Sequence, residues 1–525
     1  MSHNKIISYK EAAKLIKDGD TVATTTFGLG GLAEQLLVGI KERYDEEQHP
    51  KGITFVHSCG IGNNTPGRGL DHLVAEGLVD HLISGHIGSS PLMVKNVVDN
   101  KVQCHLIPQG VMNQLYRSIG GKKPGLVTKV GLQTYVDPRV EGAKANSITK
   151  GDISEVLTIN GEEWLNYKNF PINVALIRGT YADSKGNISF EEETGKLEGL
   201  PLATAAHNTG GIVIAQVKCI VEDGTINAKD VYVPGMLVDY VVVVEDEKYH
   251  SQTMGTLYNP SLSAQVRVPT HHTESIPLDE RKVIARRAAM ELKPHSIVNL
   301  GIGIPAGVGS VAIEEGIGDE LTLTLELGVI GGVPATGLDF GAAYNPEAII
   351  EHHAMFDIYD GNGLDLTVLG LAQTDQYGNI NVSKFGTRVA GPGGFINISQ
   401  NTQNIVFVGS FTVGGKSEIR DGKVVIKEQG KAKKFLKQVE QITFSGKYAY
   451  ENKQNVLYVT ERGVFDIYEG RMRLIEIAPG IDLQKDILEW MDFEPIIAEN
   501  LKEMDSALFQ ENWGQLKDIV MAKAK

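Results

Sequence analysis

The chain has 525 residues and a formal net charge of −15, with 42% hydrophobic and 22% charged residues. A single hydrophobic core stops growing near about 250–300 residues, so this length predicts two or three domains. The negative charge argues against nucleic acid or an anionic membrane as the main partner, because binding to either depends on clustered lysine and arginine. The composition is otherwise that of a globular protein, and its 59 glycines predict many tight turns.

The cysteines and the first residues bear on the cellular compartment. Cys59, Cys104 and Cys219 are far apart and form no CxxC motif, so neither a disulfide framework nor a thiolate metal site is indicated. The N-terminal "MSHNKIISYKEAAKLIKDGD" lacks the apolar core of a signal peptide. No window approaches the ~18 apolar residues of a membrane span. We expect a cytoplasmic protein without a membrane partner.

The first predicted elements occur twice along the chain. Ser8–Glu11 is a capping box that opens a helix, and residues 21–26, "TVATTT", form a strand that enters the glycine turn and helix of 27–37. The same order returns with a helix at 281–292, followed by a strand, a glycine turn and a helix within 296–316. This order predicts an internal repeat.

A second repeated motif supports this. D-x-x-G-N-I occurs at Asp183–Ile188 and again at Asp375–Ile380. It is most simply a turn into a strand, in which Asp and Asn bond their own backbone and Gly takes a positive φ. We therefore predict two related domains, residues 1–258 and 277–525, joined by a polar linker at 259–276.

The predicted strands identify the fold class. "ITFVHS", "VALIRG", "GIVIAQV", "YVVVVE", "SIVNLG", "LTVLGLA" and "NIVFVG" are near-continuous apolar runs, typical of strands that helices cover on both faces. The fold class is therefore α/β, with an open, largely parallel sheet in each of two tandem domains. Ligands are expected at the carboxyl ends of such strands.

One carboxylate stands out because it ends the apolar run "LTLTL" and is followed at once by glycines. Glu326 has three competing interpretations. It can cap the next segment or pair with a base, as acidic residues at element ends often do. It can hold the ribose of a dinucleotide, since G-x-G-x-x-A at 301–306 precedes it by about 20 residues. A second copy of that pattern at 28–33 is followed by a strand that ends without an acid, which favours an inherited turn over a cofactor site.

The third interpretation of Glu326 is a nucleophile. A carboxylate can attack an acyl group to form an anhydride, provided that backbone amides stabilise the oxyanion. It is already ionised at pH 7 and requires no general base. The following glycines let the backbone approach a substrate closely. No G-x-S-x-G elbow, P-loop or HExxH motif offers another centre.

Three further groups have structural and functional interpretations. His271–His272 and His352–His353 invite a metal, but adjacent histidines on a strand face opposite ways and no acidic or thiol ligand completes either set, so we expect no metal. The basic loop 120–124 could meet phosphates, although a solvated loop is at least as plausible. Residues 430–441 resemble a basic amphipathic helix, for which a plain surface helix is the simpler prediction.

Longer motifs reveal a resemblance that covers nearly the whole chain. They are E-x-G-x-x-G-G at 326–332, "NLGIGIPAGV", "GPGGFINISQNT", "VTERGVF", "IPQG", "ALIRGTYADSKGNI" and "VPGMLVDYVVV". In these runs the chain resembles the family I CoA-transferases. With both halves in one polypeptide it is most similar to the propionate and acetate CoA-transferases, and more distantly to succinyl-CoA:3-oxoacid CoA-transferase.

The resemblance implies that Glu326 is the nucleophile of a ping-pong exchange. It would attack an acyl-CoA thioester to give an acyl-glutamyl anhydride, which CoA thiolate converts to a glutamyl-CoA thioester, and an incoming carboxylate would reverse these steps. Acetate, propionate and butyrate are the implied acids, with lactate and acetoacetate as further candidates. Coenzyme A is then a substrate, and no other cofactor is implied. Family members are generally homo-oligomers, dimers or tetramers.

Site residues follow from the same resemblance. Gly394 and Phe395 would supply backbone amides near the thioester, and Gln109 would hydrogen-bond the substrate or oxyanion. Gly30 and Gly31 would shape the acyl pocket, which places the site between the halves. The glycine turn departs from the family pattern here, with "TTFG" and "AEQ" where "GGFG" and "IPE" are common, and this departure bears on acyl specificity.

Two alternative functions outside the transferases can be distinguished from CoA transfer by experiment. A thioester hydrolase would use the same pocket and release free CoA without a carboxylate acceptor. An NAD-binding oxidoreductase would use the G-x-G-x-x-A turn together with Glu326, and its affinity for NAD would fall on Glu326→Ala.

Overall fold

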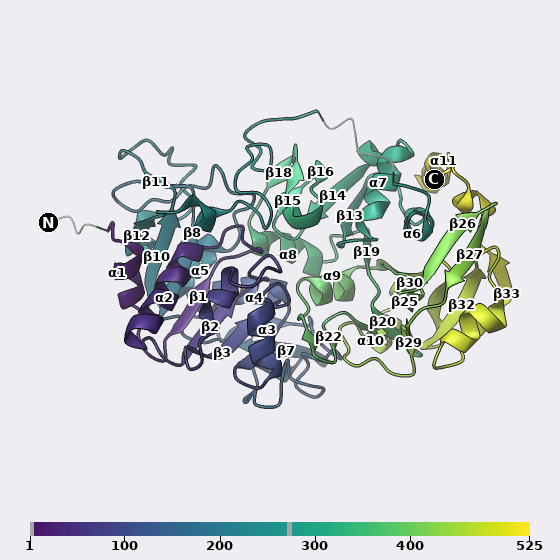
Figure 1. Ribbon diagram of the computed structural model, residues 1–525, viewed down its shortest axis with the longest axis horizontal. Helices are drawn as coiled ribbons and strands as arrows, with labels where there is room; N and C mark the ends of the chain where they lie inside the picture. Colours follow the sequence, from purple (N-terminus) through teal and green to yellow (C-terminus); the bar gives the residue numbers. More distant parts are fainter. Residues whose placement is uncertain (1–4, 270–275, 525) are drawn as a thin grey trace. The chain divides into compact units, whose positions relative to one another are not determined.

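The computed structural model describes residues 5–269 and 276–524 (Figure 1). The chain divides into two compact units. Unit 1 comprises the described residues of Met1–Val268 together with Leu325–Asp357 and Lys384–Asn397. Unit 2 comprises the described residues of Pro269–Thr324, Ile358–Ser383 and Ile398–Lys525. The units are thus interleaved in sequence, and segments of the second half belong to unit 1. Part of the predicted linker, 270–275, lies outside the described residues.

Unit 1 is built on a parallel sheet with the strand order β12-β10-β8-β1-β2-β3-β4. Its strands are β1 (Thr21–Thr24), β2 (Ile53–His57), β3 (Val79–Ser84), β4 (Gln103–Leu106), β8 (Val174–Arg178), β10 (Ile212–Val217) and β12 (Tyr240–Val243). Its helices are α1 (Tyr9–Lys14), α2 (Glu34–Glu47), α3 (Pro91–Val98), α4 (Gln109–Gly120) and α5 (Gly199–Asn208). The predicted capping box is present, because Ser8 and Glu11 bond each other's backbone amides at the start of α1.

Smaller strands complete unit 1. They are the antiparallel set β5 (Gly125–Thr128), β6 (Ser154–Ile159) and β7 (Glu162–Lys168), and the pairs β9 (Tyr181–Ala182) with β11 (Cys219–Ile220), β15 (Val329–Ile330) with β18 (Ala348–Ile349), β16 (Val333–Pro334) with β17 (Ala343–Tyr344), and β22 (Lys384–Phe385) with β23 (Arg388–Val389). Helices α8 (His352–Asp360) and α9 (Phe395–Asn401) begin in this unit.

Unit 2 contains a mixed sheet in which β14-β13-β19-β24-β30 are parallel neighbours, β31 and β32 continue antiparallel, and β33 pairs parallel with β32. Its strands are β13 (Ser296–Leu300), β14 (Leu321–Leu325), β19 (Leu366–Gly370), β24 (Asn404–Val408), β30 (Asn455–Val459), β31 (Gly463–Tyr468), β32 (Arg471–Ile477) and β33 (Ile496–Glu503). Its helices are α6 (Glu280–Ala289), α7 (Ala306–Glu314), α10 (Gly446–Glu451) and α11 (Leu516–Met521). The predicted α/β class with largely parallel sheets is confirmed.

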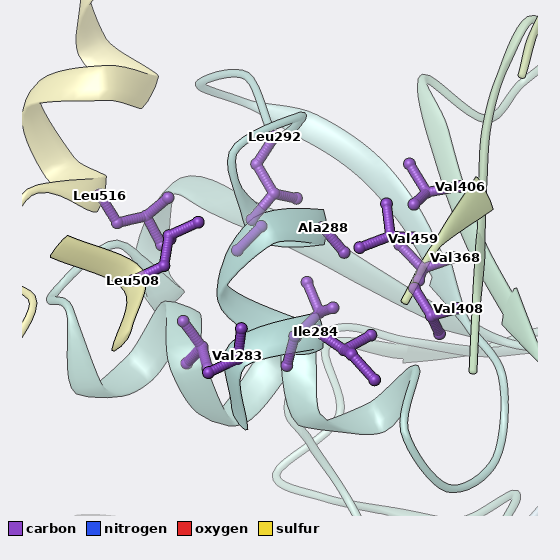
Figure 2. Packing of buried hydrophobic residues seen from close by; sticks show 14 of the residues in the cluster. Val283, Ile284, Ala288, Leu292, Val368, Val406, Val408, Val459, Leu508 and Leu516 are labelled. Atoms are coloured by element: carbon purple, nitrogen blue, oxygen red, sulfur yellow. The ribbon is translucent and has the colours of Figure 1, made fainter. Parts of the chain in front are cut away.

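The core of unit 2 surrounds α6. Figure 2 shows Val283, Ile284 and Ala288 of this helix packed between strand residues such as Val368 and Val459 and side chains near the C-terminus. Each fully buried aliphatic side chain contributes about 1.5–3 kcal/mol by removal from water. The apolar face of the predicted helix 281–292 is therefore the packing centre of the unit.

Both D-x-x-G-N motifs form the predicted turn. Asp183 Oδ1 accepts from the amides of Lys185 and Asn187, and the Asn187 side chain donates to Asp183 Oδ2 at 2.7 Å. Asp375 and Asn379 repeat this pattern before β21 (Ile380–Asn381). The motif is structural in both places, as the turn propensities of its residues predict.

The helix predicted for 430–441 is wrong. The segment instead contains β28 (Ala432–Lys433) and β29 (Phe435–Leu436). β29 pairs with β20 (Gln373–Asp375), and the Phe435 ring lies 4.6 Å from Phe411 and 4.9 Å from Phe465 between ring centroids. Tertiary aromatic packing here overrides the local basic pattern. The nearby strands are β25 (Thr412–Val413), β26 (Lys416–Arg420) and β27 (Lys423–Glu428).

Glu34 supports a stability prediction for unit 1. Its buried carboxylate accepts from Arg68 Nη2 at 2.7 Å and from the Gly69 amide at 2.7 Å, and it lies 3.2 Å from His72 Nε2. Burial alone would raise the pKa of Glu34, but the bonds from His72, Arg68 and Gly69 outweigh it and lower the pKa to about 2. Because the folded-state pKa is depressed, the ionised group stabilises the fold above about pH 4.5, and this contribution is lost as the pH falls toward 2.

We therefore expect Glu34→Gln to lower the free energy of unfolding by about 3 kcal/mol at pH 7. The difference from wild type should shrink as the pH falls below about 4.5, because the wild-type carboxylate then becomes protonated. Denaturant unfolding at several pH values measures this. Glu46→Gln, exposed on the same helix, is the control and should change stability by less than about 0.5 kcal/mol. An equal, pH-independent loss in both variants would contradict the prediction.

Candidate active site

Glu326 follows β14 directly and belongs to unit 1. Its side chain is half-buried at an apolar cluster that includes the residues on either side of it. The apolar cluster comprises Phe27, Cys59, Leu197, Leu325, Leu327, Val329 and Ala343, with Phe340 and Ile349 packed against it. The nucleophile predicted from sequence thus lies in a setting that limits contact with water.

The surroundings of Glu326 affect its ionisation. Burial raises the pKa of its carboxyl group, while His352 and a hydrogen bond from Gln109 act in the opposite direction, and the net effect is a raised pKa. A carboxylate that is poorly hydrated but still held by a donor is more reactive toward an acyl carbon than one in water. The buried thiol of Cys59 has a pKa raised well above its usual range, by burial first and then by Glu326. Cys59 therefore stays a neutral thiol beside the carboxylate.

Gly394 lies against the carboxyl group of Glu326. A Cβ added to Gly394 would be 2.8 Å from Cδ of Glu326 and 2.9 Å from each carboxylate oxygen. Only glycine allows the backbone this approach. The Phe395 amide, also predicted from the resemblance, donates to the Pro392 carbonyl at 3.0 Å. The structure thus brings Gly394 to the Glu326 carboxyl group, and the roles of Gly394 and Phe395 stay predictions.

Gln109 is the first residue of α4 and is held from two sides. Its backbone amide donates to the Gly393 carbonyl at 2.9 Å, and its side-chain Nε2 lies 2.8 Å from Nε2 of His352. The side chain is 1% exposed. The predicted residues Gln109, Gly394 and Glu326 are therefore neighbours, although they come from both halves of the sequence.

Gly30 and Gly31 form the turn after β1. A Cβ on Gly30 would lie 2.7 Å from the Gln252 carbonyl oxygen, and one on Gly31, whose φ is +63°, would lie 2.0 Å from Cδ1 of Leu197. Leu197 belongs to the apolar cluster beside Glu326. The turn consequently touches this cluster, and a role of Gly30 and Gly31 in shaping an acyl pocket stays a prediction.

The strand ends of unit 1 explain this convergence. Gly30, Ser58, Gly85 and Gln109 follow β1, β2, β3 and β4, which are neighbours in the parallel sheet. Parallel strands bring their carboxyl ends to one edge, where ligands of open α/β sheets bind. The chain returns to this edge at Gly393, whose amide donates to the Gly85 carbonyl at 2.9 Å.

Sequence reasoning missed three residues next to this group. Ser58 Oγ donates to Glu198 Oε1 at 2.6 Å, and Glu198 Oε2 lies 2.9 Å from Nδ1 of His352. All three side chains are 0% exposed. His352 begins helix α8 and is not on a strand. From the sequence, His352 was weighed only as a metal ligand. Neither Ser58 nor Glu198 lies in a motif that would have identified it.

The basic segment around loop 120–124 and the predicted histidine pairs were also compared with the structure. Arg117 pairs with Asp357 at 3.1 Å, and Lys129 pairs with Glu162 at 2.9 Å, and both pairs lie on the surface near loop 120–124. No group of three or more His, Cys, Asp or Glu residues that could hold a metal occurs within 5–269 and 276–524. His271 and His272 lie outside the described residues.

No helix in the described part of the chain is long and apolar enough to cross a membrane.

Comparisons with known proteins identify relatives of this chain. Residues 6–244 match the family model described as coenzyme A transferase. The chain is 53% identical to a caffeate CoA-transferase of Acetobacterium woodii over 99% of its length and 100% of that protein. It is 41% identical to the acetate CoA-transferase YdiF of Escherichia coli K12, over 96% of the chain and 95% of that protein.

A solved structure extends the comparison to three dimensions. The acyl-CoA transferase YdiF of Escherichia coli O157:H7, crystallised as a thioester complex with CoA, superposes with a TM-score of 0.91 at 40% identity, covering 97% of each chain. At this identity the agreement concerns sequence as well as fold.

Proposed function

This chain belongs to the coenzyme A transferase family and is an enzyme that moves CoA between carboxylic acids, and we propose that it does so through a thioester on Glu326. The contact between Gly394 and the Glu326 carboxyl group carries this proposal, because it places backbone beside the atom that would react. The half-buried, poorly hydrated state of Glu326 supports it further.

The proposed exchange has two half-reactions. The Glu326 carboxylate attacks the thioester carbonyl of an acyl-CoA. The C–S bond breaks, CoA departs as its thiolate, and an acyl-glutamyl anhydride is formed. The thiolate then attacks the glutamyl carbonyl, which releases the first acid and leaves glutamyl-CoA. A second carboxylate attacks this thioester, which releases CoA thiolate and forms a new anhydride. The thiolate then attacks the acyl carbonyl of that anhydride, which gives the new acyl-CoA and frees the Glu326 carboxylate.

Gln109 and Gly394 have complementary roles in this scheme. The Gln109 amide donates to the carboxylate in the resting enzyme and is placed to stabilise negative charge on oxygen during attack. Gly394 leaves room for the acyl carbon next to the nucleophile. The anhydride and the thioester conserve the group-transfer potential of the acyl-CoA. The proposed reaction therefore uses CoA as a substrate and requires neither ATP nor a metal.

We propose short-chain monocarboxylic acids as the substrates, namely acetate, propionate and butyrate, with lactate and acetoacetate as further candidates. The acetate CoA-transferase relative supports this class. The 53% identity to a caffeate CoA-transferase favours a second candidate class, the arylacrylic acids. Gly30 and Gly31 beside Leu197 would set the size limit in either case.

Steady-state kinetics tests the proposal. With acetyl-CoA as donor, double-reciprocal plots at several fixed concentrations of propionate should be parallel, which marks a covalent enzyme intermediate. A panel of acetate, propionate, butyrate, lactate, acetoacetate and caffeate should give the highest kcat/KM for a short-chain acid. Intersecting lines would contradict the ping-pong scheme. Free CoA released at the same rate without any acceptor would identify a thioester hydrolase, and a preference for caffeate would replace the short-chain class.

Compartment and assembly complete the proposal. Cys59 and Cys104 are buried free thiols and Cys219 is an exposed one, which suits the reducing cytoplasm. We also propose a homo-oligomer, a dimer or tetramer, on the resemblance to family members. Light scattering coupled to size-exclusion chromatography should give a mass at least twice that of the 57.0 kDa chain.

A further inference from the structure

A chain of buried polar side chains leads to the Gln109 amide from deep within unit 1. Ser58 Oγ donates to Glu198 Oε1 at 2.6 Å, and the other Glu198 oxygen lies 2.9 Å from Nδ1 of His352. Nε2 of His352 then lies 2.8 Å from Nε2 of Gln109. The exposed fraction is 0% for Ser58, Glu198 and His352 and 1% for Gln109. We call Ser58, Glu198 and His352 the buried relay.

The chemistry of these groups sets the direction of every hydrogen bond. A carboxylate can only accept, so Glu198 accepts one hydrogen bond from the Ser58 hydroxyl and one from the Nδ1–H of His352. A neutral imidazole protonated on Nδ1 has its lone pair on Nε2. The Gln109 amide nitrogen can only donate, so it supplies one N–H to that lone pair and keeps the second.

The second N–H of Gln109 is then the donor that is available to Glu326. The hydrogen bond between the Gln109 side chain and the Glu326 carboxyl group stabilises the ionised form. A Gln109 amide rotated by 180° would present its oxygen to both His352 Nε2 and Glu326, and both contacts would become repulsive. The tautomer of His352 therefore selects one of the two amide orientations.

We propose that Glu198 and His352 are positioning residues for CoA transfer, which fix the side-chain amide of Gln109 so that it donates to the nucleophile Glu326. This inference rests on the proposed function, since it assumes that Glu326 is the reacting group. His352 is fully buried and contacts the Gln109 side chain through Nε2.

The relay has a consequence for the pH dependence of activity. Glu326 must be ionised to attack, and loss of the Gln109 donor removes an interaction that lowers its pKa. The titratable groups that face Glu326 are His352 and Cys59, and those that face Glu198 also include Tyr116 and Tyr232. With the relay broken, the acid limb of the profile of kcat/KM, which reports the free enzyme, moves to higher pH.

The test uses Glu198→Gln in the full-length enzyme. This near-isosteric change removes the obligatory acceptor, so the Nδ1–H tautomer of His352 is no longer enforced. We expect kcat at neutral pH to fall by about 10–100-fold with KM within about 3-fold, and the acid limb of kcat/KM to move up by about 1 pH unit. His352→Gln provides a second variant with the same expected effects if Glu198→Gln does not fold.

A double variant separates positioning from a general structural role. If Glu198 acts through Gln109, adding Glu198→Gln to Gln109→Leu should cost less than about 3-fold in kcat beyond Gln109→Leu alone. Asp137→Asn is the matched control, because Asp137 is also a buried carboxylate but is bonded by Gln133 and Arg139. It should lower thermal stability and leave the pH profile unchanged.

The outcomes distinguish this inference from the proposed function. An unshifted acid limb in folded Glu198→Gln and His352→Gln, or fully additive losses in the double variant, would overturn the role of the relay. Glu326→Gln would still be inactive in that case. Retained transfer in Glu326→Gln would instead overturn the proposed function itself.

Discussion

Glu326→Gln should stay folded and lose CoA transfer by roughly four orders of magnitude. The amide is nearly the same size as the carboxylate, so the half-buried position beside Gly394 still accommodates it. It is a far weaker nucleophile and cannot form the anhydride. The loss should appear in kcat, and binding of acyl-CoA measured by calorimetry should change by less than about 10-fold.

An exposed carboxylate from the same segment provides the control. Glu347→Gln changes the same functional group in Leu325–Asp357 and should retain transfer within about 2-fold. Circular dichroism and the melting temperature of both variants should match wild type. Near-normal activity in folded Glu326→Gln would remove the nucleophile from this account.

Gly394→Ala should lower kcat by about 10–100-fold. The added Cβ would lie 2.8 Å from the Glu326 carboxyl carbon, closer than carbon atoms can approach, so the carboxylate must move aside. Displacement of a reacting group by as little as 1 Å can cost about 100-fold in rate. The peptide geometry itself tolerates alanine, because Gly394 is not among the glycines with a positive φ.

Gly370→Ala controls for the glycine-to-alanine change. Within the described residues, no atom lies within 4 Å of a Cβ built there, and its φ is not positive. This variant should keep kcat within about 2-fold. Single-turnover measurements should place the defect of Gly394→Ala in the chemical step. An unchanged kcat in Gly394→Ala would show that the nucleophile does not occupy the position described.

Much of the fold was predictable because its signals are local. The capping box at Ser8 and the apolar strands are each recognisable from a few consecutive residues, and the structure has them at the expected places. The helix predicted for 430–441 failed because Phe435 packs against two distant rings. Unit 1 also includes Leu325–Asp357 and Lys384–Asn397 from the second half of the sequence, which no local pattern encodes.

The site was predictable only in part, for a similar reason. Glu326 stood out as a single carboxylate between an apolar strand and glycines, and the resemblance added Gln109 and Gly394. Glu198 and His352 are separated by 154 positions and meet only after folding. A buried glutamate in an unremarkable segment and a histidine beside a second histidine carry no signal in one sequence. Their proposed role depends on the direction of the hydrogen bonds that join Glu198, His352 and Gln109, which only the three-dimensional structure reveals.

The central claim is that CoA becomes covalently attached to Glu326. Mass spectrometry of the intact enzyme, with and without acetyl-CoA, followed by peptide mapping, tests it most directly. We predict an adduct with the mass of CoA on the peptide that contains Glu326, released when acetate is added and missing in Glu326→Gln. An enzyme that turns over without forming such an adduct, or one that carries CoA on another residue, would contradict this account.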